Sequence, residues 1–169
     1  PCSLYHTTDQ IHDLSNILDQ QIIRSSQKAI ASQEEVNLDY AIKNTDRATG
    51  VMLSGLVAQK YGAQGLPDST INVKFKGSAG QSFGAFLAGG ISFKLEGETN
   101  DYFGKGLSGG RIAILPPVRS NFNAEDNIIA GNTGLYGATS GELYINGKVG
   151  ERFAVRNSGA IAVVEGAGD

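Results

Sequence analysis

A pattern of glycines and aromatic residues recurs from residue 71 onward with a period of about twenty positions. In each copy a glycine is followed, after five residues, by an aromatic and a small residue, and after four more by another glycine. The copy that starts at Gly131 is two positions shorter. The copies comprise Gly77, Phe83, Gly84 and Gly89; Gly97, Phe103, Gly104 and Gly109; Gly131, Tyr136, Gly137 and Gly141; and Gly147, Phe153 and Gly159. A fixed period predicts a repeat architecture in which each unit buries its apolar face against the next.

The residues between these glycines are typical of strands and tight turns. Apolar residues alternate with polar ones, as at Ile71, Val73 and Phe75, and the absence of a helical period excludes the helical repeat families. Twenty extended residues trace a path of roughly 65 Å, which is one circuit of a narrow tube. The sequence therefore predicts an all-β fold, a single-stranded parallel β-helix with glycines at its corners. Inside it we expect an aromatic ladder of Phe83, Phe103, Tyr136 and Phe153.

Short helices are predicted before the repeats. We interpret residues 1–35 as a helical approach or linker segment, in which Thr7 and Gln10 fit a capping box. Apolar residues then recur on one helical face, at Ile11, Leu14, Leu18 and Ile22. This helical segment is a candidate cap for one end of the β-helix, because the ends of a repeat stack need covering.

Residues 36–70 predict a strand and a short capping helix. Residues 36–42 alternate as a half-buried strand does, and Asn44 to Asp46 offer a helix N-cap. The helix is expected to end at Tyr61, with Gly62 as its C-cap. Residues 71–169 form the β-helix repeat domain, which we expect to be truncated at its C-terminus because the chain stops inside an apparent repeat. Residues 115–128 interrupt the period as an insertion.

Composition and charge exclude several classes of function. The formal net charge of −3 gives no basic field for nucleic acid, and no apolar run approaches the roughly 20 residues that span a bilayer. The single cysteine, Cys2, cannot form an internal disulfide or hold zinc or an iron–sulfur cluster alone. We expect no catalytic, cofactor-binding or metal-binding residue in this chain, no nucleic-acid or membrane partner, and a cytosol-like compartment.

Two glycine motifs match known sites in letters only. Residues 104–109 fit G-x-G-x-x-G, and residues 106–110 fit G-x-S-x-G around Ser108. Both motifs need a helix immediately afterwards, for phosphate binding in one case and for the nucleophile elbow in the other. The residues that follow, from Arg111 to Leu115, predict a strand. We therefore interpret these glycines as corners of the repeat.

Other polar residues predict a solvated surface. His6 and His12 have no carboxylate or cysteine cluster around them. A β-helix that hydrolyses carbohydrates needs paired carboxylates, and the acidic residues do not recur at matching repeat positions; they are Glu96, Glu98, Asp101, Glu142 and Glu151. The arginines either form an interdomain ion-pair surface or pair locally; they are Arg111, Arg119, Arg152 and Arg156.

The repeats resemble the C-terminal domain of the glutamate synthase large (alpha) subunit. The likeness spans residues 36–169 and is carried by residues 77–86, 97–112, 131–133, 136–138 and 150–160, including the run Ala-Gly-Gln-Ser-Phe-Gly-Ala-Phe. Residues 1–35 are similar only loosely, and Gly134 and Ser140 depart from the family pattern. The same repeat occurs in a subunit of formylmethanofuran dehydrogenase, so an interaction subunit of that type of redox complex is the alternative.

The resemblance implies a right-handed β-helix with a structural, non-catalytic role. Glutamate synthase moves the amide nitrogen of glutamine to 2-oxoglutarate and, with a reductant, yields two glutamates. The family's N-terminal cysteine nucleophile, its FMN and its iron–sulfur cluster belong to other domains, and Cys2 does not match the nucleophile because Pro1 precedes it. The expected partners are the amidotransferase and FMN/synthase domains of the same polypeptide, in the cytoplasm or the plastid stroma.

Overall fold

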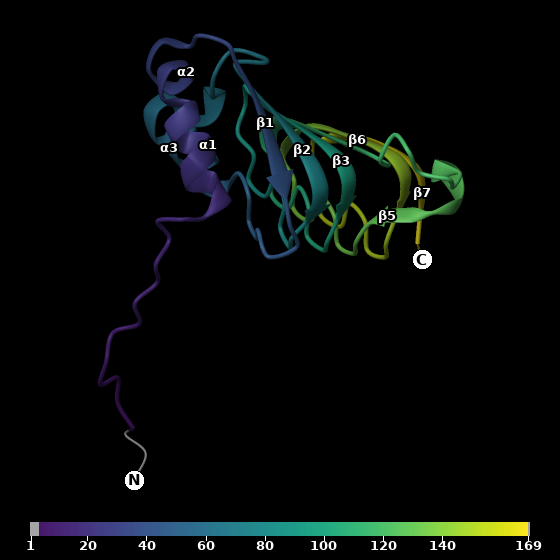
Figure 1. Cartoon of the computed structure of the whole chain (residues 1–169), viewed down its shortest axis with the longest axis horizontal. Helices are drawn as coiled ribbons and strands as arrows, with labels where there is room; N and C mark the ends of the chain where they lie inside the picture. The colour runs from purple at the N-terminus through teal and green to yellow at the C-terminus, as the bar shows by residue number, and fades with distance from the viewer. Residues whose placement is uncertain (1–3, 169) are drawn as a thin grey trace.

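One sheet of seven strands dominates the computed structural model, which describes residues 4–168 (Figure 1). Every strand pair in this sheet is parallel. The strands are β1 (Val36–Ile42), β2 (Ile71–Ala79), β3 (Ile91–Thr99), β4 (Ser108–Leu115), β5 (Ile128–Ala130), β6 (Ser140–Val149) and β7 (Ile161–Ala167). The prediction of an all-β chain with a few short helices is therefore confirmed.

The strand register reproduces the period seen in the sequence. Ile71 pairs with Ile91, and Gly77 pairs with Gly97, each twenty positions further along the chain. Each strand, with the return segment that leads to the next, forms one layer. Two layers are longer than the others: one contains helix α3 (Val51–Tyr61), and one contains the insertion after β4, with a short 3₁₀ helix η2 (Ala124–Asp126). In the second case β4 and β5 together supply the strand of a single layer, because both pair with β3 and β6.

Alternate residues of each strand point into the core. Phe75 and Phe93 are fully buried, and their rings meet edge to face at 4.9 Å. Phe83 reaches the same cluster from a return segment, with its ring centroid 5.4 Å from that of Phe75. Rings in this geometry add roughly 0.5–1.5 kcal/mol per pair beyond the burial of apolar area.

The return segments are built from left-handed residues at alternate positions. Backbone hydrogen bonds hold successive segments in register, as from the Gly104 N–H to the Phe83 carbonyl at 2.9 Å. Because L-residues pay about 1–2 kcal/mol for this conformation, the inter-layer bonds must maintain it wherever the residue is not glycine. The left-handed sets are Ser82, Gly84 and Phe86; Tyr102, Gly104 and Gly106; Thr133, Leu135 and Gly137; and Arg152, Ala154 and Arg156.

The predicted aromatic ladder is wrong at Tyr136. The Leu135 N–H bonds the Phe103 carbonyl and the Ala154 N–H bonds the Gly134 carbonyl, so Gly134 occupies the position of Phe103 and Phe153. The Phe103 and Phe153 rings stack at 6.4 Å across the layer that contains Gly134. A Cβ at Gly134 would collide with the Phe103 ring.

The predicted register of the shortened copy, which begins at Gly131, is also wrong. Gly131 follows Ala130, which pairs with Thr99, so its equivalent in the previous layer is Asn100 and not Gly97. An alignment that matches Tyr136 with Phe103 gives this shift, because the residue equivalent to Phe103 is Gly134, which has no side chain.

Three helices cover the β1 end of the sheet, as Figure 1 shows. They are α1 (Leu18–Ser25), α2 (Gln27–Ser32) and α3, and a short 3₁₀ helix η1 (Gly62–Gln64) follows α3. Ile22, Leu53 and Val57 are fully buried and belong to the same apolar cluster as the strand interiors. The helices therefore bury the apolar face of the first layer. None of the helices between residues 4 and 168 has the length and apolarity that crossing a membrane requires.

The helix predicted from Thr7 onward is wrong over its first part. Residues 4–17 contain no helix, α1 begins at Leu18, and Ile11 is 94% exposed. Residues 1–3 lie outside the described residues. An isolated helix shorter than about 12–15 residues is marginal in water without tertiary packing, and Ile11 packs against nothing that would supply it.

The start of α3 also differs from the prediction, whereas its end is confirmed. The N-cap is Gly50, and Asn44 to Asp46 lie in the first return segment instead. The C-cap is Gly62, in the left-handed region with φ 64°.

Candidate functional site

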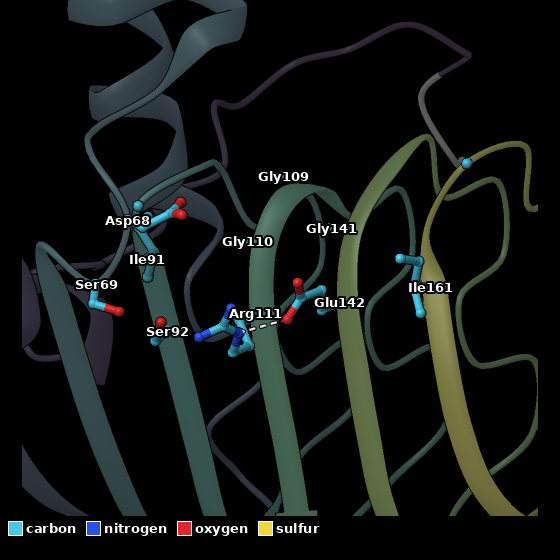
Figure 2. Close-up of a pocket in the computed structure, with 12 residues that line it drawn as sticks. Asp68, Ser69, Ile91, Ser92, Gly109, Gly110, Arg111, Gly141, Glu142 and Ile161 are labelled. Atoms are coloured by element: carbon cyan, nitrogen blue, oxygen red, sulfur yellow. Dashed lines mark hydrogen bonds and ion pairs between the residues drawn. The ribbon is translucent and has the colours of Figure 1, made fainter.

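A shallow groove runs across the layers where the strands begin (Figure 2). Its volume is about 220 Å³, and its lining includes a glycine or glycine pair from each of four successive layers. The glycines are Gly90, Gly109, Gly110, Gly141 and Gly159, and the side chains around them include Asp68, Ser69, Ser92, Arg111, Glu142 and Ile161.

Crowding between layers explains the glycines of this groove. Gly109 and Gly141 have φ values of 107° and 104°, in the left-handed region. A Cβ at Gly141 would collide with the carbonyl oxygen of Gly110 in the preceding layer. The concave floor is thus a consequence of close backbone packing at the corner, as expected for corner glycines.

One ion pair dominates the electrostatics of the groove. The Arg111 Nε donates to Glu142 Oε2 at 2.7 Å, from β4 to β6 (Figure 2). The same carboxylate oxygen accepts the Tyr144 hydroxyl at 3.1 Å. Both hydrogen bonds lower the pKa of Glu142. The bond between Arg111 and Glu142 raises the pKa of Arg111 above its ordinary value. The bond to Glu142 also raises the pKa of Tyr144.

The Tyr144 phenol provides a direct test of this arrangement. In Glu142→Gln we expect the pKa of Tyr144 to fall toward its ordinary value of 10.0, because the neutral amide stabilises the protonated phenol less than the carboxylate does. Titration of ring-labelled tyrosine by NMR, assigned with Tyr144→Phe, measures the shift. Asp68→Asn, on the groove rim, is the control, and in this variant the pKa of Tyr144 should stay raised. An unchanged Tyr144 titration in Glu142→Gln would contradict the geometry.

The two glycine motifs lie where the repeat interpretation places them. β4 begins at Ser108, so a strand follows both motifs and no helix does. The Ser108 hydroxyl donates to the Phe86 carbonyl at 3.4 Å. His6 and His12 lie in the exposed segment before α1, and His6 is 3.8 Å from Asp9. The structure therefore brings no histidine into the groove.

The acidic residues mostly take part in local contacts. Glu96 pairs with Lys76 at 3.7 Å, and Glu98 accepts the Ser78 hydroxyl. The expectation that no acidic positions match is wrong for one pair, because Asp101 and Glu151 are equivalent, two layers apart, with Asn132 between them.

These matching positions have a structural use. The Asp101 carboxylate accepts the Asn132 N–H, and the Asn132 side-chain oxygen accepts the Glu151 N–H, at 2.7 and 2.8 Å. The side chains therefore bridge one layer to the next.

Of the four candidate arginines, Arg111 has the ion pair described above. Among residues 4–168, neither Arg152 nor Arg156 forms an ion pair with Glu151. Local pairing is therefore found for Arg111 and not for this pair of arginines.

The residues of this chain do not fit the iron–sulfur cluster that the resemblance implies for a parent enzyme. An iron–sulfur cluster needs several thiolates, and the sequence has one cysteine. Within the described part of the chain, no cluster of three or more His, Cys, Asp or Glu side chains suits a metal ion. The groove, at about 220 Å³, is smaller than the roughly 300–1,000 Å³ of pockets that enclose organic ligands.

Comparison with known proteins assigns the repeat. The family model described as "GXGXG motif" matches residues 19–169. The chain belongs to this family. All of the repeat glycines and aromatics, and the groove, lie within the part that the GXGXG motif model matches.

Relatives of this GXGXG chain are long glutamate synthases. It is 54% identical to "Glutamate synthase [NADH]" of Saccharomyces cerevisiae over 94% of the chain and 7% of that protein. It is 49% identical to the "Glutamate synthase [NADPH] large chain" of Bacillus subtilis, over 97% and 10% respectively. It is 50% identical to "Ferredoxin-dependent glutamate synthase 2" of Synechocystis, over 95% and 10%. The chain thus spans about a tenth or less of these relatives, and the resemblance drawn from the sequence is confirmed.

Proposed function

We propose that this chain is a structural, non-catalytic domain of a glutamate synthase, folded as a right-handed, single-stranded parallel β-helix. In the proposed parent, glutamine, 2-oxoglutarate and a reductant give two glutamates, and this domain positions the amidotransferase and FMN/synthase domains of the same polypeptide. The observation that carries the proposal is the 46–54% identity, over nearly the whole chain, to relatives named as glutamate synthases.

The names of the relatives support a role separate from electron delivery. They specify NADH, NADPH or ferredoxin, yet the similarity to this chain is comparable in all of them. A part shared by enzymes with different electron donors is best explained by a task that all of them have. Passing an ammonia intermediate between two sites is such a task, because it requires those sites to be held in a fixed relation.

The bonding between layers supports the rigidity that this role would require. Strands pair across every layer, the return segments bond one another, and three helices cover the β1 end. FMN and the iron–sulfur cluster would be held by other domains, and the single cysteine of this chain is too few for such a cluster. The parent would work in the cytoplasm or, as in the relative named "chloroplastic", in a plastid.

The test compares the isolated chain with the full-length enzyme. We expect the purified 169-residue chain to be colourless and to hydrolyse no glutamine. In the full-length enzyme, a variant that loosens this domain, Asp19→Ala, should release ammonia in excess of the glutamate formed, whereas Lys94→Gln, an exposed change, should not. Glutaminase turnover or bound flavin in the isolated chain, or unchanged coupling in a demonstrably loosened variant, would refute the proposal.

The alternative of a formylmethanofuran dehydrogenase-type subunit is not favoured, since the matched relatives described above are glutamate synthases.

A further inference from the structure

The outward face of the sheet changes character from its first strand to its last. Strand register aligns outward residues into rows that cross the layers. Ala113 and Tyr144 pair, as do Tyr144 and Val163. The whole row is Asp39, Lys74, Lys94, Ala113, Tyr144 and Val163. It is charged on β1 to β3 and apolar on β4 to β7.

The apolar end of this row is exposed. Tyr144 is 40% exposed, Val163 is 56% exposed, and the neighbouring outward residue Ile161 is 61% exposed. We call these three residues and Ala113 the outer patch. Adjacent large apolar side chains on an outward sheet face are unlike scattered surface apolar residues, and they mark interaction sites.

The edge of the outer patch is polar and ordered. Arg111 and Tyr144 both donate to Glu142. These two bonds fix where the Tyr144 phenol lies, and the charged pair is only half exposed, at 49% and 34% for its two side chains. A pre-ordered aromatic ring surrounded by satisfied polar groups is the arrangement found at the centres of protein interfaces.

We propose that the outer patch is the surface through which this chain docks against another domain of the same polypeptide, an inference that rests on the proposed function. The matched relatives are about ten times longer than the chain. In a protein of that length, most of the polypeptide lies outside this structure, and another domain is available to pack against the outer patch. The complementary surface would present apolar side chains to Tyr144, Ile161 and Val163, and a polar group to the Arg111–Glu142 pair.

The size of the outer patch favours a tethered partner over a separate one. Stable complexes between free proteins bury about 1,200–2,000 Å², which is more than four side chains on three strands provide. A domain on the same polypeptide is held at a high effective concentration, so a small interface suffices. A second copy of the chain lacks this advantage.

The test uses photo-crosslinking in the full-length enzyme. With p-benzoylphenylalanine at Tyr144, irradiation and peptide mass spectrometry should identify a crosslink to another domain of the same polypeptide. The same probe at Lys94, in the charged part of the same row, is the matched control and should give none. The double variant Ile161→Lys with Val163→Lys should reduce the Tyr144 crosslink to the Lys94 background.

The outcomes separate this inference from the proposed function. No crosslink at Tyr144, a crosslink only to a second copy, or a Tyr144 crosslink that persists in the double-lysine variant would overturn the docking surface. An intramolecular crosslink that the double-lysine variant abolishes would establish it. If the double-lysine variant abolishes this crosslink but does not increase the ammonia released in excess of glutamate, the docking surface is established and the positioning role is refuted.

Discussion

Replacing Gly97 with alanine should be among the most destabilising single changes in this chain. Gly97 lies in β3, in the interior of the sheet, with φ 152°. A Cβ there would collide with the carbonyl oxygen of Gly77, its pairing partner in the preceding layer. The change adds about 1–2 kcal/mol of backbone strain and about 1–3 kcal/mol of overpacking. We expect the free energy of unfolding to fall by about 2–5 kcal/mol, measured by urea denaturation.

Gly137→Ala is the matched control, because it makes the same chemical change without a collision. Gly137 is also left-handed, with φ 64°, but a Cβ there would meet no atom within 4 Å. Only the strain of about 1–2 kcal/mol remains. The difference between the variants therefore measures the inter-layer contact, and equal unfolding midpoints would contradict the close packing of Gly77 on Gly97.

The repeats could be predicted from sequence because the period of twenty is set by inter-layer pairing. Apolar residues such as Ile71 and Ile91 recur at that period because each residue of a strand pairs with the equivalent residue of the preceding layer. The predicted alignment is wrong at Gly134. The layers on either side have an aromatic residue at this position, but here it is glycine, because the rings of Phe103 and Phe153 stack across this layer. A sequence pattern defined by aromatic side chains cannot identify a position at which packing requires glycine.

The left-handed residues show a related limit. Phe86, Leu135 and Arg156 adopt φ values of 56–57°, which no local preference of these residues predicts. Their conformation is imposed by hydrogen bonds to neighbouring layers, such as that from the Phe86 N–H to the Lys105 carbonyl at 2.7 Å. Tertiary bonding therefore overrides residue preference in the return segments.

The sequence does not predict the outer patch, for a different reason. Tyr144, Ile161 and Val163 have the alternating pattern of ordinary strand residues. Only the strand register shows that Val163 faces outward beside Tyr144. The signal available in the sequence was the charge of Lys74 and Lys94 at the equivalent positions of earlier repeats.

Asp19→Ala should detach the helical cap from the first layer. Asp19 is 4% exposed, and its carboxylate oxygens accept the Gly50 N–H at 2.5 Å and the Met52 N–H at 2.8 Å. These donors are at the start of α3, so a side chain of α1 caps α3 across the interface. Alanine leaves the buried Gly50 N–H and the part-buried Met52 N–H without this acceptor. A buried N–H that loses its acceptor costs about 1–3 kcal/mol, and a part-buried one costs less. We expect a loss of about 3 kcal/mol in the free energy of unfolding.

Asp13→Ala is the control for this change. The Asp13 carboxylate accepts hydrogen bonds from Ser15 in the exposed segment, so its removal should leave the unfolding midpoint in place. Amide hydrogen exchange at Gly50 and Met52 should accelerate in Asp19→Ala and not in Asp13→Ala. Equal stability of the two variants would show that Asp19 does not hold the cap.

The pH dependence of stability tests the burial of the same carboxyl. Burial raises the pKa of Asp19 above its ordinary value of 3.8, against the lowering effect of its backbone hydrogen bonds. The folded chain therefore holds the Asp19 proton more tightly than the unfolded chain does. The stability contributed by this group is complete below pH 3.8 and is lost as the pH rises through the raised value. Asp19→Asn, which cannot titrate, should lack this component, so the gap in unfolding free energy between wild type and Asp19→Asn should shrink as the pH rises. A gap that widens over this range would mean that the hydrogen bonds outweigh burial.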